Sequence, residues 1–259
     1  MKKILFPFLC LLILSFILGS CKKNNNPVSS EDKDYSNYYP SGAGNYYKYY
    51  IERTNADGIK TTGTRDTRYG ISSEHNGIYT LKVDSIAVGD SINIYNSFFR
   101  ETDAGVYYFL DPSGFLASLP QEYAAFIPYL KIDPEMLLLS APLYNGQTWT
   151  VFKVNIEQNI VLTVVDVEAV YLGKEDLLLN LNSGNTTKAT VKIEYDFSFI
   201  NPITQDNQTS TVYGWFAADI GAVKWEGDGF LLNLFTRGEL NLADSSSTGI
   251  ENLIDYNIK

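Results

Sequence analysis

Histidine and paired carboxylates are the side chains of this sequence that could carry out acid–base chemistry. His75 is the single histidine, and it lies in Ser73-Glu-His-Asn-Gly77, which reads as a turn between two strands. A catalytic histidine needs a nucleophile and an orienting acid close to it. No Gly-x-Ser-x-Gly or His-Glu-x-x-His motif occurs. We therefore interpret His75 as a solvated turn residue.

Two carboxylate pairs have a spacing that glycoside hydrolysis could use. Asp166 and Glu168 form one pair, and Glu194 and Asp196 form the other. Each pair lies on one face of a predicted strand because side chains alternate. Two carboxyls that share a substrate have separated pKa values and can act as acid and base. Solvated strand faces are the simpler explanation of these residues and of Asp84, so we expect no catalytic residue.

The composition excludes several classes of protein. One His and two Cys among 259 residues exclude most His/Cys metal sites. Asp219 and residues 226–229 are candidates for calcium, but they match no known calcium loop and read as ordinary turns. We expect no metal, no cofactor and no enzymatic activity. The chain has 20 basic and 30 acidic residues and no basic run beyond Lys22-Lys23, which is unsuited to binding nucleic acid.

The N-terminus has the organisation of a secretory signal. Lys2 and Lys3 precede an uncharged apolar stretch at residues 4–18, and Gly19-Ser20 then leads to Cys21. Residues 18–21, Leu-Gly-Ser-Cys, resemble the lipobox of bacterial lipoproteins. The resemblance implies cleavage between Ser20 and Cys21, a diacylglycerol on the Cys21 thiol, and a further acyl chain such as palmitate on its amino group. The alternative is an uncleaved membrane anchor.

The chain is expected to consist of a signal peptide (1–20), a lipidated Cys with a flexible tether (21–38), and a β-rich body (39–259). Residues 22–38 are polar and lack periodicity, as linkers do. Loss of Lys2 and Lys3 leaves 18 basic and 30 acidic residues, which anionic headgroups would repel. Lys22 in place of Asp resembles the outer-membrane sorting pattern of enteric bacteria. The side of that membrane is left open.

Alternating and β-branched segments, separated by Gly, Asn and Asp turns, predict a mainly β body. We expect a large antiparallel curved sheet or a half-open barrel, because short connections join antiparallel neighbours. The candidate strands are residues 46–53, 60–72, 78–88, 91–101 and 106–111, followed by 148–156, 160–172, 176–181, 188–199, 210–217, 222–226 and 230–240.

One segment, residues 119–139, has helical spacing, although Pro128 and Pro134 divide it into short pieces. Tyr123, Phe126, Ile127 and Leu130 share one face of this expected short, broken helix. Two interpretations are open: the helix packs over the sheet as core, or it forms a mobile lid over an apolar cavity.

An internal similarity suggests two related halves, residues 39–140 and 141–259. Pro40 and Pro142 are each followed by Gly at +4 and an aromatic residue at +7. Asp103-Ala-Gly105 and Asp219-Ile-Gly221 both precede an apolar strand. The spacing between repeats differs by 14 residues, so coincidence of common turn chemistry is the alternative to duplication.

Three motifs resemble those of a family of uncharacterised bacterial lipoproteins. Its patterns "YPLxxGNxWxY", "PLxxGxxW" and "W[FY]AxG[VI]GxVK" are similar to residues 39–49, 142–149 and 215–224. Ser41 and Tyr47 depart from the first pattern, which has Leu and Trp there. The resemblance implies no assigned activity. More remotely, the strand pattern is similar to the half-open barrels of the LolA/LolB type, which carry lipoproteins or lipids.

Adjacent aromatic residues place rings on both faces of several strands, and an exposed aromatic face would bind a lipid, a glycan or a protein. We therefore expect a non-catalytic envelope lipoprotein that binds a hydrophobic or amphipathic ligand in a sheet-lined cavity. The alternative is a structural protein that docks onto another envelope protein or a surface glycan. The candidate surface residues are Tyr123, Phe126, Ile127, Leu130, Trp149 and Trp215.

The lipidation hypothesis predicts the result of changing Cys21→Ser. The variant should fold but leave the membrane fraction, because several acyl chains are needed for stable anchoring. Fractionation of host cells followed by immunoblotting measures this. A variant that stays in the membrane fraction would show that the thiol is not the anchor.

Overall fold

The computed structural model describes residues 33–110, 112–113, 116, 119, 121, 124–204, 206–237 and 248–259. These residues belong to one unit of the chain, Asp32–Lys259. The predicted signal peptide, the cleavage site at Ser20 and Cys21, and the first part of the tether lie outside the described residues.

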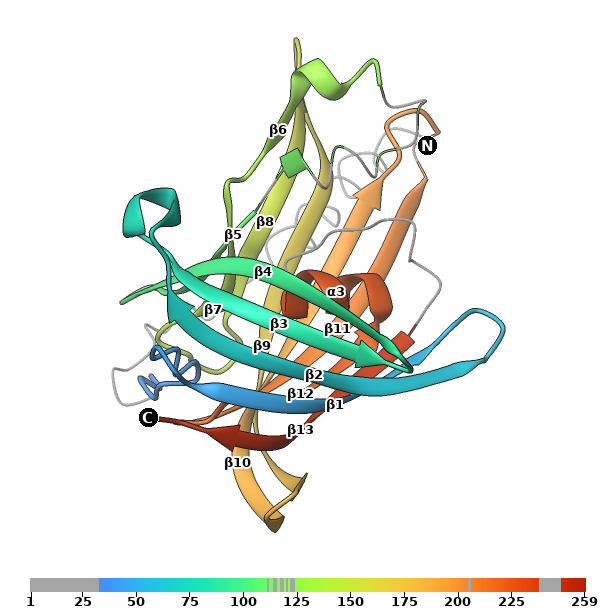
Figure 1. The fold of residues 1–259 in the computed structure, drawn as a ribbon. Helices are drawn as coiled ribbons and strands as arrows, with labels where there is room; N and C mark the ends of the chain where they lie inside the picture. The colour runs from blue at the N-terminus through green and yellow to red at the C-terminus, as the bar shows by residue number, and fades with distance from the viewer. Residues whose placement is uncertain are drawn as a thin grey trace, which may run out of the picture. The chain divides into compact units, whose positions relative to one another are not determined.

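The described residues form one antiparallel sheet of 13 strands, in the order β6-β8-β9-β10-β11-β12-β13-β1-β2-β3-β4-β5-β7 (Figure 1). The predicted fold class is therefore confirmed. The strands are β1 (Tyr46–Thr54), β2 (Lys60–Ile71), β3 (Thr80–Val88), β4 (Ser91–Thr102), β5 (Gly105–Phe109), β6 (Leu130–Ile132), β7 (Glu135–Ser140), β8 (Thr148–Glu157), β9 (Val161–Leu181), β10 (Gly184–Ile200), β11 (Asn207–Ala217), β12 (Gly221–Asp228) and β13 (Thr248–Asn257).

Two meanders make up the sheet, and they join where β13 pairs with β1. The first contains β1 to β5 and β7, and the second contains β8 to β13. The first meander lies within residues 39–140 and the second within residues 141–259, but β6, which belongs to the first of these halves, pairs with β8. The duplication itself stays a prediction.

Side chains link the end strand β7 to the second meander. The Trp149 indole N–H donates to the carbonyl of Leu137 at 3.0 Å, and the Tyr195 hydroxyl donates to the carbonyl of Leu138 at 2.8 Å. No backbone ladder joins β7 to β8 in the described part of the chain. We call this junction the seam, because side-chain hydrogen bonds take the place of strand pairing there.

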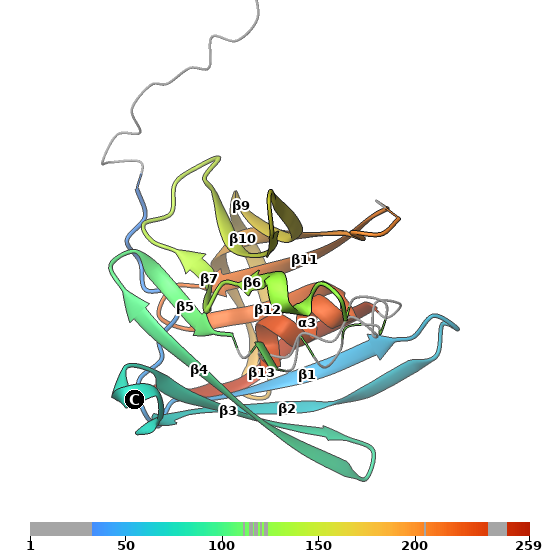
Figure 2. The ribbon, with the colours of Figure 1, turned by 90° about the horizontal axis from the view of Figure 1, so that it is seen from above.

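Helix α3 (Gly229–Arg237) lies inside the curved sheet (Figure 2). The side chains of Leu231, Leu232, Leu234 and Phe235 are at most 1% exposed. A helix that is apolar around its circumference has to be surrounded by other elements. The core therefore consists of this helix and the inward side chains of the strands.

Two sequence-based assignments are wrong. Residues 230–240 were predicted as a strand, but α3 occupies Gly229–Arg237. Residues 119–139 were predicted as broken helix, but among its described residues this region has 3-10 geometry only at Gln121 and at Ile127–Tyr129, and the strands β6 and β7 follow. Pro128 and Pro134 prevent a longer helix, and Met136 and Leu138 point inward with the two-residue period of a strand.

The segment that precedes β1 is fastened to the sheet at Asp34. Its backbone exchanges two hydrogen bonds with Leu143, of 2.7 and 3.0 Å. Its carboxylate accepts a hydrogen bond from the Tyr38 hydroxyl at 2.7 Å and pairs with Lys174 of β9 at 2.7 Å. Burial alone raises the pKa of Asp34, but the hydrogen bonds from Lys174, Ser36 and Tyr38 hold that pKa well below its usual range.

The seam predicts a stability effect for Trp149→Phe. The change should lower the free energy of unfolding by about 1 to 3 kcal/mol, because it leaves the Leu137 carbonyl without its donor. Urea unfolding of the purified protein measures this. Tyr35→Phe, at an exposed ring, is the control and should have little effect. Equal stability of the two variants would contradict the role of the seam.

Candidate functional site

A cluster of charged side chains lies inside the body. Arg65, Lys82, Asp84 and Glu251 are at most 3% exposed, and they occupy inward positions of β2, β3 and β13. The prediction that Asp84 is solvated is therefore wrong. On β3 the polar residues Lys82 and Asp84 face inward, while Leu81 and Val83 are only half-buried.

Arg65 is the centre of this charged cluster. Its guanidinium contacts Asp84 at 2.9 Å and Glu251 at 2.6 Å, and Arg53 also pairs with Glu251. Lys82 contacts Asp84 at 2.8 Å and donates to the carbonyl of Thr236 at 2.6 Å. Thr236 is in the last turn of α3, where a cation compensates the free carbonyls and the helix dipole. The cluster thus joins four strands to the helix.

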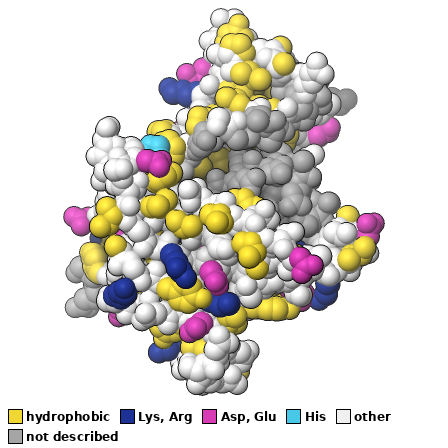
Figure 3. Space-filling model, in the orientation of Figure 1, with side chains coloured by type: hydrophobic (Ala, Val, Ile, Leu, Met, Phe, Trp, Pro, Cys, Tyr) yellow, Lys and Arg dark blue, Asp and Glu magenta, His cyan; other side chains and the backbone are white. Residues whose placement is uncertain are grey.

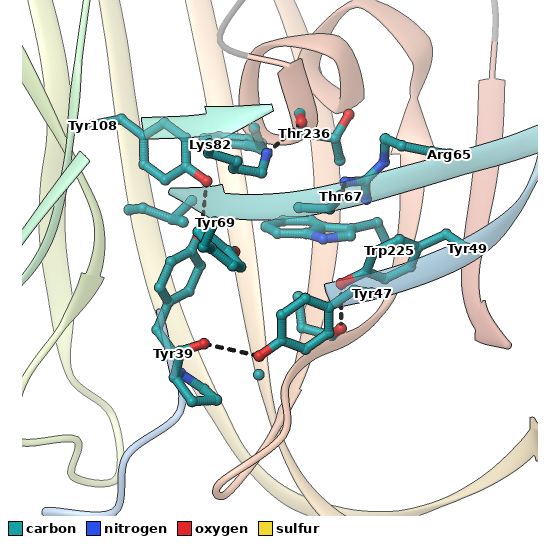
Figure 4. Close-up of a pocket in the computed structure, with 15 residues that line it drawn as sticks. Tyr39, Tyr47, Tyr49, Arg65, Thr67, Tyr69, Lys82, Tyr108, Trp225 and Thr236 are labelled. Carbon is teal, nitrogen blue, oxygen red and sulfur yellow. Dashed lines mark hydrogen bonds between the residues drawn. The ribbon is translucent and has the colours of Figure 1, made fainter. Parts of the chain in front are cut away.

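The cavity beside this cluster is small. Its volume is about 20 Å³, and Tyr39, Tyr47, Tyr49, Tyr69 and Tyr108 line it together with Trp225 (Figure 4). This is room for one water molecule. Tyr47 and Tyr49 donate their hydroxyls to the carbonyls of Pro40 and Ala222 at 2.8 and 2.9 Å. Burial raises the pKa of both tyrosines, so they remain neutral donors.

Glu251 is ionised despite its burial. Burial alone raises the pKa of this carboxyl, but the charges of Arg65 and Arg53 and their hydrogen bonds outweigh that effect and hold its pKa at about 2. Each charge in the cluster therefore has an opposite partner. The arrangement is that of a structural ion cluster, and its small cavity leaves no room for a lipid.

A larger depression, of about 460 Å³, lies over β9, β10 and β11. We call it the β9–β11 depression. It brings together three of the four predicted carboxylates, Asp166, Glu168 and Asp196. The register explains this, because Asp196 is directly opposite Glu168 and Asp166 is one pair further along the same face. The fourth, Glu194, is half-buried and does not line the depression.

The lining of the depression combines charge with apolar surface. Asp166 pairs with Lys153 at 2.9 Å, and Asp196 accepts a hydrogen bond from the Thr211 hydroxyl at 2.7 Å. Ile200 is a half-buried apolar residue of the lining, whereas Val164 and Phe197 are only 4% and 3% exposed, and Thr163 and Thr209 contribute further hydroxyls. The depression therefore offers three carboxylates, hydroxyl groups and apolar atoms to a bound molecule.

Exposed apolar side chains gather at the same end of the sheet. Ile160 and Val161, at the β8–β9 turn, are 76% and 66% exposed, and Ile203 is in the β10–β11 turn. Ile127 and Tyr129 precede β6, which pairs with the end of β8. Figure 3 shows hydrophobic atoms at the top of the molecule, where β6 and the tip of β9 lie in Figure 1. We call these five side chains the apolar rim.

The residues predicted to form a binding surface are in different places. Ile127 belongs to the apolar rim, whereas Phe126, Leu130 and Trp149 are half-buried against the core. Tyr123 lies outside the described residues. Trp215 is 5% exposed. The sequence therefore identified one member of the rim, and the isoleucines of the two hairpin turns were missed.

Trp215 is enclosed by contacts within the chain. The ammonium groups of Lys192 and Lys224 lie 4.8 and 4.5 Å from its ring, and its indole N–H donates to Glu175. Glu175 is on the long β9–β10 ribbon, whose turn residue Asn182 donates to the carbonyl of Ile254 in β13 at 2.8 Å. The ribbon therefore folds back onto the outer face of the sheet.

His75 lies in a short 3-10 turn at Glu74–Gly77, as predicted, but it is half-buried, so the prediction that it is solvated is wrong. Its ring is packed among the rings of Tyr79, Phe98 and Phe109, at 4.2 to 5.5 Å between centroids. Among the described residues, no group of three or more His, Cys, Asp and Glu side chains could hold a metal ion. The helices in the described ranges are all too short or too polar to span a bilayer.

Comparisons with known proteins found similarity at the level of solved structures only. No family model and no curated protein matches the chain. A Bacteroides fragilis protein described as exported, with a YmcC-like fold, is 14% identical over 86% of this chain and 99% of its own, with a TM-score of 0.45. A Parabacteroides distasonis protein described as a lipoprotein is 11% identical over 86% of this chain and 100% of its own, with a TM-score of 0.43. The hypothetical lipoprotein YmcC from Escherichia coli is 10% identical over 81% and 84%, with a TM-score of 0.33. These similarities are too remote to assign a family.

The buried cluster predicts a loss of stability in acid. The pKa of Glu251 is about 2 in the folded protein and about 4.5 when unperturbed, so its contribution is complete above pH 4.5 and is lost as the pH falls towards 2. Glu251→Gln should be less stable at neutral pH, because Arg65 and Arg53 lose a partner, and its stability should depend less on pH in this interval.

Urea unfolding at several pH values measures both effects. Glu226→Gln is the matched control, because Glu226 is a partly exposed carboxylate on the other face that pairs with Lys224. The control should keep the acid dependence of the unchanged protein. If Glu251→Gln keeps the full dependence as well, Glu251 does not couple folding to pH.

Proposed function

We propose that the protein is a lipid-anchored lipoprotein of the outer membrane and that it binds an amphipathic ligand non-catalytically at the β9–β11 depression. The observation that carries this proposal is the depression itself, in which Asp166, Glu168 and Asp196 share one lining with the half-buried Ile200. Lipidation at Cys21 rests on the lipobox resemblance. The side of the membrane is left unassigned.

The described interior gives reason to place the ligand on the surface. The interior is occupied by α3 and by the buried ion cluster, and the cavity beside that cluster has room for one water molecule. A ligand with an acyl chain needs more volume than that. We therefore propose that the ligand binds on the outer face of β9, β10 and β11, and not in the sheet-lined interior cavity expected from the sequence.

The charges of the depression define the chemistry of the ligand. Three carboxylates against the single cation of Lys153 favour a head group that is cationic or rich in hydroxyl donors. The apolar lining and the nearby apolar rim would hold a hydrocarbon portion. Asp166 and Asp196 are engaged with Lys153 and Thr211. We therefore assign these carboxylates to recognition and not to acid–base catalysis.

The apolar rim favours a second candidate function. Five exposed apolar side chains on adjacent turns are also suited to docking onto another envelope protein, and the ring of Tyr129 is suited to a surface glycan. In that case the rim would carry the affinity and the carboxylates would be dispensable. The two candidates therefore differ in which residues matter.

A pair of single-chain amphiphiles tests the proposal. Titration calorimetry with decyltrimethylammonium and decyl sulfate, both below their micelle concentrations, should show preferential binding of the cationic compound. The double variant Glu168→Gln/Asp196→Asn should bind the cation roughly thirty-fold more weakly, because each of the two charges, at about 4 Å, contributes about 1 kcal/mol in water.

The control carries the same chemical changes elsewhere. Glu74→Gln/Asp90→Asn removes two exposed carboxylates that lie outside the depression, and it should bind as the unchanged protein does. Equal affinity for the two amphiphiles, or unchanged binding by the first double variant, would refute recognition by these carboxylates.

A further inference from the structure

Strand β4 has a free edge at its N-terminal end. It pairs with β3 along its length, but β5 pairs with it only from Phe99 to Thr102. Residues 91–94 therefore have a strand neighbour on one side only among the described residues. Figure 2 shows the turn of the β3–β4 hairpin at the lower edge of the view, away from β5. We call residues 91–94 the β4 edge.

The β4 edge lacks the features that protect free edges. No charged residue and no proline occurs from Ser91 to Phe99, although 19% of the chain is charged. Ile92 and Ile94 are 68% and 69% exposed and lie on the same face of the strand. Natural edge strands are usually blocked by lysine, proline or a bulge, and an uncharged apolar edge is a template for pairing with another strand.

The hairpin geometry shows which backbone groups are available. Gly89 and Asp90 form a two-residue turn, with Gly89 at a φ of 57°, between the paired residues Val88 and Ser91. In such a hairpin the pair that flanks the turn is hydrogen-bonded, and hydrogen-bonded and open pairs then alternate. The N–H and C=O groups of Ile92 and Ile94 therefore point away from β3, towards the open side.

We propose that the β4 edge pairs with the β4 edge of a second copy of this chain. In an antiparallel arrangement about a two-fold axis at Asn93, Ile92 of one copy lies opposite Ile94 of the other. Both residues present N–H and C=O groups to the partner, so the two copies form hydrogen-bonded pairs on each side of the axis. Four isoleucine side chains then form one cluster on the outer face.

A second copy fits this edge because the edge is complementary to itself. The available backbone groups and the isoleucines are placed symmetrically about Asn93, as a two-fold interface requires. The chain has a net charge of −10, which opposes association in general, but the edge contributes none of that charge. Salt screens the remaining repulsion beyond about 8 Å at physiological ionic strength.

Disulfide crosslinking at the two-fold axis tests the proposal. The chain has cysteines only at positions 10 and 21, so Asn93→Cys adds the one thiol of the β-rich body. In the proposed register position 93 faces its own copy as an open pair with about 4.5 Å between Cα atoms, which a disulfide can bridge. Most of the full-length protein, expressed in a Gram-negative envelope, should become a disulfide-linked dimer.

Ser91→Cys is the matched control, because it is exposed on the same strand but lies away from the axis. It should remain mostly monomeric, as should the unchanged chain. Adding Ile94→Lys to Asn93→Cys should abolish the dimer by placing two charges at the contact. Protection from protease verifies that each variant is folded.

Two results would overturn the proposal. Equal crosslinking of Ser91→Cys and Asn93→Cys would indicate collisions without a defined register. A monomeric Asn93→Cys, or a crosslinked product whose mass is not that of two copies, would show that the edge does not pair with a second copy.

Discussion

The fold depends on the ion pairs of Arg65 with Asp84 and Glu251. These three side chains come from β2, β3 and β13, and Lys82 extends their cluster to the last turn of α3. Charges that are removed from water are costly unless each has a partner, and loss of one partner leaves another charge uncompensated. The helix, the central strands and the tyrosines around the small cavity therefore have to occupy one arrangement. The helix and the charged cluster also occupy the interior space that a lipid carrier would leave open.

The fold class could be predicted from the sequence, but the content of the interior could not. Alternation and turn residues identify most of the strands. Reading the faces of a strand from alternation assumes that its polar residues face water. On β3 the opposite holds, since Lys82 and Asp84 face inward. On β13, Glu251 is buried between Gly249 and Leu253, so that strand shows little apolar alternation and was missed. The ion partners Arg65 and Glu251 are 186 residues apart, and nothing local in the sequence connects them.

At the candidate site too, the spacing of residues within one strand could be read from the sequence, but the pairing between strands could not. The spacing of Asp166 with Glu168, and of Glu194 with Asp196, correctly places each pair on one face of a strand. Only the pairing register of β9 with β10 shows that Asp196 joins the other pair and Glu194 does not. The run Leu231–Phe235 is apolar at almost every position, and periodicity cannot separate a buried strand from a buried helix in such a run. The structure shows that this run is a helix, α3, which is packed on all sides.

The attachment of the N-terminal segment at Asp34 has a mechanical consequence. Any tension applied to the chain before this residue is divided between two backbone hydrogen bonds to Leu143 and the ion pair with Lys174. These contacts have to break together, and Tyr38 and Tyr39 are buried just beyond them as a second restraint. Force is thus delivered to β9 and to the loop before β8. The force is therefore not applied first to β1 or to the strands that carry the buried charges.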